Sequence, residues 1–361
     1  MKATNQARDS VMNLKLPALV LSLLILAQTS YAQRAPYTTI VFEEGGTYTA
    51  LDGFGNLLLS VDPSPHLGDI AAAPFPNPGD DPAPLLQAAF NRKGDIYVAG
   101  GSYDFKENFQ GLRVRSFSRI SIARDATFTV PRGFSNALFT FQSVQATTLE
   151  GGFYTEEGGA GNIEAGIEPA PRRWTLFRFV GGKDAAGCHG NVIRDIRTWF
   201  VGKVIHLTAT SSTGWNNGNR FSNFSVFAYR VGIEFSKTGL FQRNYFDNLI
   251  YQTDPFLRTR TGARRIRGVA NTFLNVYFYD AVVGTQPTGG DPQGDIVLAT
   301  LPVERITGNV AWITEEATGT LIIGGIMTQP VDKFVDNGVN TQIIDELHRP
   351  ALHPPPPPHP H

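Results

Sequence analysis

The sequence has little cysteine, little charge and little helical patterning. Cys188 is its single cysteine, so no disulfide can form within the chain. Charged residues make up only 17% of the sequence. From residue 191 to residue 280 no segment sustains helical spacing of apolar residues, which excludes an array of helical repeats. With 42% hydrophobic residues, 11% aromatic residues and 37 glycines, the composition is typical of a turn-rich all-β protein with a large core.

A short asparagine motif recurs four times in the middle of the chain. Each copy reads Asn, any residue, a large apolar residue, any residue, then Asn or Asp, and an apolar residue follows. The copies begin 28, 25 and 27 residues apart, at Asn191, Asn219, Asn244 and Asn271. A period in this range predicts a solenoid, in which each repeat is one coil that is buried by its neighbours.

The residues between these motifs predict the type of solenoid. Runs such as 203–207 and 230–235 are β-branched or aromatic and are broken by Gly and Asn, which indicates short strands. We therefore predict an all-β fold, a right-handed parallel β-helix with a short N-terminal capping helix. The asparagines are expected to stack from coil to coil as a turn ladder, and not to act in catalysis. Cys188, next to His189, is expected to be a buried coil residue, although a thiol nucleophile or metal ligand is an alternative.

The ends of the chain differ from its centre. Residues 1–32 combine an apolar stretch at 16–27, a preceding Lys15 and a small-x-small site ending at Ala32, as in an export signal. A secreted or periplasmic protein is expected, with no integral membrane segment after signal cleavage. We divide the rest into a hairpin and Pro-rich lead at 33–78, a β-helix domain at 79–345 and a disordered Pro/His tail at 346–361. The hairpin turn is placed at Asp52-Gly53.

A helix and a strand are expected at the start of the β-helix domain. Asp81 before Pro82 is a good helix start, and Leu85, Leu86, Ala89 and Phe90 form one apolar face. This Gly-Asp-Asp segment, Leu-Gln-Ala-Ala helix and Gly-x-Ile-Tyr-Val strand resemble the opening of pectate-lyase-like right-handed parallel β-helix proteins. The resemblance covers about residues 79–330 and implies that the helix caps the coil stack. Because that superfamily includes polysaccharide lyases, glycoside hydrolases, tailspikes and adhesins, the resemblance does not select one activity.

Aligning the coils on their asparagines gives one candidate site. His206 and Glu234 fall at equivalent positions between inward apolar residues, so both are expected to point outward from adjacent strands, about 4.8 Å apart. An imidazole beside a carboxylate can act as a base and its orienting group. The alternative is an exposed cross-strand pair without a catalytic role.

Basic residues are concentrated around this pair. Residues 172–267 contain 16 Lys and Arg against 5 Asp and Glu, whereas the rest of the chain contains 15 against 27. Such a one-signed segment favours an acidic partner, or else the acidic flanks pack on it and neutralise it. The catalytic candidates are His206, Glu234 and Lys203, with Tyr229 or Tyr251 as the acid. The substrate-binding candidates are Arg194, Arg197, Arg230, Lys237 and Arg243.

These residue types favour β-elimination over hydrolysis. Elimination of a uronate needs a cation for the carboxylate, a base for the C5 proton and an acid for the leaving oxygen. Hydrolysis needs two well-placed carboxylates, and the few acidic residues of the basic segment do not supply a clear pair. No metal site is predicted, although calcium with Arg is left open as a cofactor. A Gly- and Glu-rich loop at 151–173 is expected to wall a groove or to be disordered.

The expected function is that of an exported, carbohydrate-active β-helix protein that binds an anionic polysaccharide and could cleave it. A polysaccharide lyase is favoured over a glycoside hydrolase, and a non-catalytic adhesin or structural surface protein is the alternative. The arginine-rich stretch at 258–267 is not assigned to nucleic acid, because the chain carries an export signal and no nucleic-acid motif. A homo-oligomer is compatible with the sequence.

Overall fold

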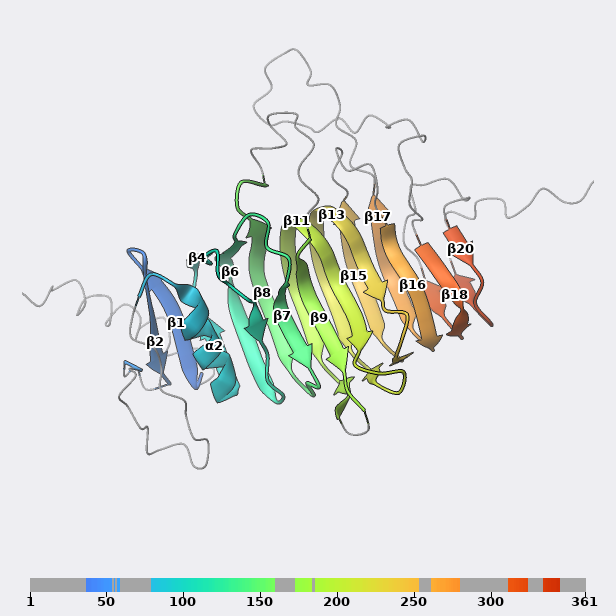
Figure 1. Cartoon of the computed structure of the whole chain (residues 1–361), viewed down its shortest axis with the longest axis horizontal. Coiled ribbons are helices and arrows are strands. Elements are labelled where there is room, and N and C mark those ends of the chain that lie inside the picture. Colours follow the sequence, from blue (N-terminus) through green and yellow to red (C-terminus); the bar gives the residue numbers. More distant parts are fainter. Residues whose placement is uncertain are drawn as a thin grey trace, which may run out of the picture.

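The computed structural model shows a mostly β protein, a parallel β-solenoid of about five turns with one short helix (Figure 1). The coils succeed one another along the solenoid in sequence order, from the end with β1 and β2 to β18 and β20 near the other end. The structure describes residues 37–53, 55, 57–58, 79–159, 173–183, 186–252, 261–279, 311–323 and 334–344.

The strands stack into parallel ladders that run along the solenoid axis. The first ladder contains β3 (Gly94–Val98), the starts of β6 (Ser118–Val130), β8 (Thr148–Glu156), β11 (Val192–Ala209), β13 (Arg220–Phe235) and β15 (Tyr245–Gln252), then β17 (Thr272–Tyr279), β19 (Leu321–Ile323) and β21 (Gln342–Ile344). The second ladder begins with β4 (Gly101–Asp104) and continues through the middle of the long strands.

The third ladder positions the site described below. It contains β5 (Leu112–Arg113), β7 (Ala137–Gln142), β9 (Thr175–Gly181), the ends of β11 and β13, and then β16 (Thr261–Val269), β18 (Ala311–Thr318) and β20 (Phe334–Asp336). Short strands β10 (Cys188–His189), β12 (Trp215–Asn217) and β14 (Leu240–Gln242) lead into the asparagine turns.

Both asparagines of the repeated motif have structural roles. The first one is buried, and its amide nitrogen donates to the amide oxygen of the next coil: Asn191 to Asn219 at 2.9 Å, Asn219 to Asn244 at 3.0 Å and Asn244 to Asn271 at 3.1 Å. The predicted turn ladder is therefore confirmed. The last residue of each motif forms a corner with a left-handed backbone, which Asn and Asp tolerate better than most residues. These φ angles are 60°, 58°, 52° and 51° at Asp195, Asn223, Asn248 and Asn275.

The interior of the solenoid is filled by aromatic side chains stacked between neighbouring coils. The rings of Phe141 and Phe179 lie 4.4 Å apart, and those of Phe246 and Phe273 lie 4.7 Å apart. Cys188 is buried among these coils, as predicted, and its Sγ lies 3.1 Å from the carbonyl oxygen of Phe141.

At the N-terminal end, β1 (Thr39–Glu44) and β2 (Thr47–Asp52) form an antiparallel hairpin. Its turn is at Gly45-Gly46, which was not predicted. Gly45 and Gly46 have positive φ, 58° and 80°, as a tight hairpin turn of this kind requires. The chain also reverses at the predicted Asp52-Gly53 turn, where Leu51 and Leu57 form an antiparallel bridge and the backbone N–H of Leu58 donates to the Ala50 carbonyl at 2.8 Å. β1 also pairs in parallel with β3, so the hairpin extends the first ladder.

The predicted helix is α2 (Pro82–Arg92), which lies at the N-terminal end of the stack (Figure 1). The carboxylate of Asp81 accepts a hydrogen bond from the backbone N–H of Ala83 at 3.0 Å, which caps the helix. Its buried face is the predicted one, and Phe90 packs against Phe139 of β7, with their ring centroids 6.3 Å apart. Within the described residues, no helix is long and apolar enough to cross a membrane.

Other expectations concern the connections and the termini. Residues 151–156 belong to strand β8, so the expected loop does not begin at Gly151, and the segment 160–172 lies outside the described residues. The leader at 1–32, the Pro-rich lead at 61–78 and the tail at 346–361 also lie outside them.

Candidate functional site

A row of polar side chains follows the third ladder from strand to strand. The pairing registers align Arg113 of β5, Thr140 of β7, Arg178 of β9, His206 of β11 and Glu234 of β13. The residues on either side of this row in β9, β11 and β13 are apolar and fully buried, so the row lies on the opposite side of each strand. The predicted alignment of His206 with Glu234 agrees with this register.

The end of this row contains a cluster of three charged or titratable groups. Lys203 Nζ lies 2.5 Å from Glu234 Oε2, and His206 Nε2 lies 3.9 Å from the same oxygen. The side chain of Glu234 is only 3% exposed, against 33% for Lys203 and 17% for His206. The carboxylate was expected to be open to solvent, but it lies beneath the two nitrogen groups. A buried carboxylate requires such a cation, because an unpaired charge would be costly there.

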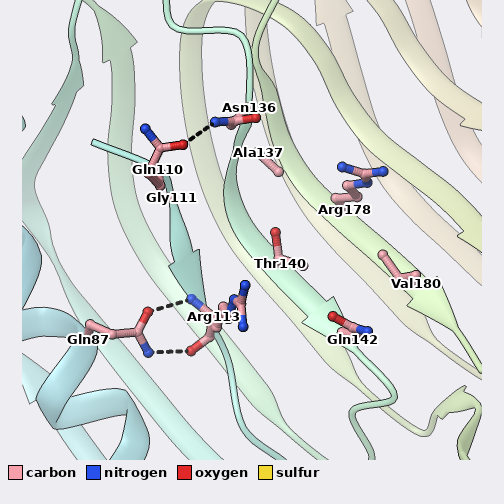
Figure 2. A pocket seen from close by; sticks show the side chains of 10 residues that line it. All are labelled: Gln87, Gln110, Gly111, Arg113, Asn136, Ala137, Thr140, Gln142, Arg178 and Val180. Carbon is pink, nitrogen blue, oxygen red and sulfur yellow. Dashed lines mark hydrogen bonds between the residues drawn. The ribbon is translucent and has the colours of Figure 1, made fainter. Parts of the chain in front are cut away.

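The other end of the row opens into a pocket of about 400 Å³ (Figure 2). Its lining combines α2, β5, β7, β9 and the segments that precede β5 and β7, and it includes two arginines and no carboxylate. The lining residues are Gln87, Gln110, Gly111, Arg113, Asn136, Ala137, Thr140, Gln142, Arg178 and Val180. In Figure 2 the guanidinium groups of Arg113 and Arg178 lie on either side of Thr140.

Hydrogen bonds fix the backbone that carries Arg113. The side-chain oxygen of Gln87 accepts from the backbone N–H of Arg113 at 2.8 Å, and the Gln87 amide nitrogen donates to the Arg113 carbonyl at 3.0 Å. This side chain from α2 therefore occupies the edge of β5 that another strand would otherwise fill. At the rim, Asn136 donates to the side-chain oxygen of Gln110 at 3.1 Å. No ion pair of Arg113 or Arg178 occurs among the described residues, so both charges face the pocket without a carboxylate partner there.

The substrate-binding candidates predicted from sequence do not gather at one place. Arg194 lies on the first ladder, where its Nε donates to Glu150 Oε2 at 2.8 Å. Arg197 lies over the ring of Phe153, with its guanidinium carbon 5.6 Å from the centroid. The remaining three lie around or after the third-ladder part of β13: Arg230 immediately precedes it, Lys237 follows it, and Arg243 lies in a later corner with φ 51°.

The contacts of Arg194 keep one carboxylate charged. Burial by itself would raise the pKa of Glu150, but hydrogen bonds from Ser121 and Arg194, together with the charge of Arg194, hold this pKa below its ordinary value. Glu150 and Arg194 therefore form a structural ion pair, and Arg194 is engaged away from the pocket.

The two tyrosines proposed as acids lie inside the solenoid. Tyr229 is 1% exposed and Tyr251 is fully buried, and their ring centroids are 5.3 Å apart. Burial and the neighbouring Tyr229 raise the pKa of Tyr251 well above its ordinary value. Both tyrosines are therefore buried away from solvent, and any proton donor beside His206 has to be another group.

Sequence reasoning did not identify Arg113 and Arg178. One signal was available for Arg178, which lies 28 residues before His206, the spacing of one coil. Arg113 had no such signal, because β5 consists of two residues and precedes the first asparagine motif.

No family model, curated protein or solved structure matches the chain. Among the residues that the structure describes, no group of three or more His, Cys, Asp or Glu side chains is arranged to hold a metal ion. The calcium cofactor considered from sequence remains a hypothesis.

Proposed function

We propose that this protein binds an anionic polysaccharide along the third ladder, and that it does so outside the cell, as its leader-like N-terminus predicts. The observation that carries the proposal is the pocket with two arginines and no carboxylate in its lining. Guanidinium groups bind carboxylates and sulfates through paired hydrogen bonds, and the amides and hydroxyl around them suit sugar hydroxyls. The concentration of basic residues in the central coils would attract such a polymer.

The register of the strands predicts the direction in which a bound polymer would run across the surface. Because Arg113, Thr140, Arg178 and His206 follow one another across adjacent strands, a bound chain would run along the solenoid axis over about three strand spacings, roughly 15 Å. Such a chain would reach from the pocket to His206 and Lys203.

Binding can be tested by measuring dissociation constants for uronate and sulfated polymers at low salt, with a neutral polysaccharide as comparison. Replacing both Arg113 and Arg178 with Gln removes two charge-assisted contacts and should weaken binding by about a hundredfold. Arg220→Gln is the control and is compared with each single variant, Arg113→Gln and Arg178→Gln. It removes one charge, as each of them does, from an exposed side chain on the first ladder, where Arg220 pairs with Asp247 at 3.4 Å. If the control lost as much affinity for the polymer as the pocket variants, the attraction would be nonspecific and the proposal would be contradicted.

A second proposal is that the cluster at His206 cleaves the bound polymer by elimination. The observation that favours it is the shared oxygen of Glu234, which brings an imidazole and an ammonium group together beside the binding row. His206 would remove the C5 proton, the electron pair would form the C4–C5 double bond, and the C4–oxygen bond would break. The departing oxygen would take a proton from Lys203 or from water.

Elimination produces an unsaturated uronate that absorbs in the ultraviolet. A rise in absorbance with wild-type protein, abolished in His206→Gln while polymer binding is retained, is the expected result. Binding without any rise across a panel of uronate polymers would reject elimination and would favour a non-catalytic adhesin or surface protein.

A further inference from the structure

The spacing of the two pocket arginines suggests what they recognise. We propose that the pocket binds the carboxylates of every second sugar in an extended polyuronate. In any three consecutive sugars, the carboxylate of the first would bind Arg113, that of the third would bind Arg178, and the middle sugar would lie over Thr140. The proposal rests on the proposed function and specifies the ligand of the same site. It would make a trisaccharide the shortest oligomer that engages both arginines.

The distance between the arginines follows from the ladder. Arg113 pairs with Thr140 and Thr140 pairs with Arg178, so one strand separates the two arginines. Two strand spacings give roughly 10 Å between their backbones. This length is close to that of two sugar rings in an extended chain, and in a ribbon-like chain alternate sugars turn their carboxylates to the same side. Adjacent carboxylates, by contrast, lie one ring apart and face opposite sides.

The backbone positions that set this spacing are well fixed. Arg178 lies between Phe177 and Phe179, which are fully buried in the core, and Arg113 is held by the two hydrogen bonds from Gln87. Thr140, midway between them, offers a hydroxyl that can both donate to and accept from the middle sugar. The fixed backbones keep the bases of the two arginine side chains at a constant separation, so a ligand with matching carboxylates can contact both at once.

The test compares short, extended oligouronates by calorimetry with the intact protein. The trisaccharide is expected to bind about tenfold more tightly than the disaccharide, because only the trisaccharide reaches the second guanidinium. A trisaccharide whose carboxylate at one end has been reduced to an alcohol should bind like the disaccharide. Both Arg113→Gln and Arg178→Gln should abolish the advantage of the trisaccharide, because each leaves a single guanidinium.

The outcomes separate this inference from the proposed function. If uronate polymers bind but the trisaccharide has no advantage over the disaccharide, the spacing inference is wrong and polysaccharide binding stands. The spacing inference is also wrong if the reduced trisaccharide keeps the full advantage, since length alone would then explain it. If no uronate oligomer or polymer binds, the proposed function itself fails. Both arginines are exposed, so the Gln variants are expected to fold, and circular dichroism can verify this.

Discussion

The asparagine ladder gives the sharpest stability prediction, and Asn219→Ala is the variant that tests it. The amide nitrogen of Asn219 donates to Asn244 Oδ1 at 3.0 Å and to the Cys188 carbonyl at 3.2 Å. Its amide oxygen accepts from the backbone N–H of Asn191 at 3.3 Å and from Asn191 Nδ2 at 2.9 Å. The side chain is fully buried, so water cannot replace these partners in the folded protein.

The size of the effect follows from these contacts. Four hydrogen bonds at about 1 kcal/mol each predict a loss of about 4 kcal/mol in the free energy of unfolding. Such a loss is a large share of the about 5–15 kcal/mol that stabilises a typical domain. Each position of the interior ladder should therefore require a side chain with both an amide donor and an amide acceptor.

The matched control is Asn223→Gly, in the outer row of the same coil. Asn223 is exposed, so water can replace its two hydrogen-bond partners: its amide nitrogen donates to Asp195 at 3.0 Å, and its amide oxygen accepts from Asn248 at 3.0 Å. Its φ of 58° suits glycine. Its loss should cost within about 1 kcal/mol. Urea unfolding followed by circular dichroism measures the stability of both variants. The dependence of the unfolding free energy on urea concentration is compared with that of the wild type, to verify that the same structure unfolds. A loss below about 1 kcal/mol for Asn219→Ala, or equal losses for both variants, would refute the role given to the buried ladder.

Three further predictions concern single residues. Gly151→Ala should destabilise the protein by about 3 kcal/mol in the same urea assay, since its φ is +87° and a Cβ there would lie 1.9 Å from the carbonyl oxygen of Ile122. Glu150→Gln should lower the free energy of unfolding above pH 4.5, the ordinary pKa of this carboxyl. The difference from wild type should vanish as the pH falls through the lower pKa that Glu150 has in the folded protein. A difference that stays the same in acid would contradict the ion pair with Arg194. Burial raises the pKa of Cys188 to about 11, so a thiol reagent at about pH 8 should label the folded protein far more slowly than the urea-unfolded one.

Local patterns in the chain were sufficient to predict the solenoid and its turns. The asparagine motif repeats once per coil, so its spacing gives both the period and the alignment of His206 with Glu234. Helix α2 was equally readable, because Asp81 and the apolar residues after it define its start and its buried face. The turn at Asp52-Gly53 was also predicted, and Leu51 pairs with Leu57 across it. The turn at Gly45-Gly46 was not predicted, because only the pairing of β1 with β2 shows that the chain already reverses there.

By itself the sequence determined the repeated coil, the buried asparagines, the capping helix and the alignment of His206 with Glu234. These features depend on residues close in sequence or one period apart, and such regularities can be read from the chain. The tertiary structure alone decided the pocket, since Gln87, Arg113, Thr140 and Arg178 come from four elements that share no motif. It also decided the burial of Tyr229, because whether a strand residue faces the core depends on where each coil turns a corner, and those corners are set by packing across coils.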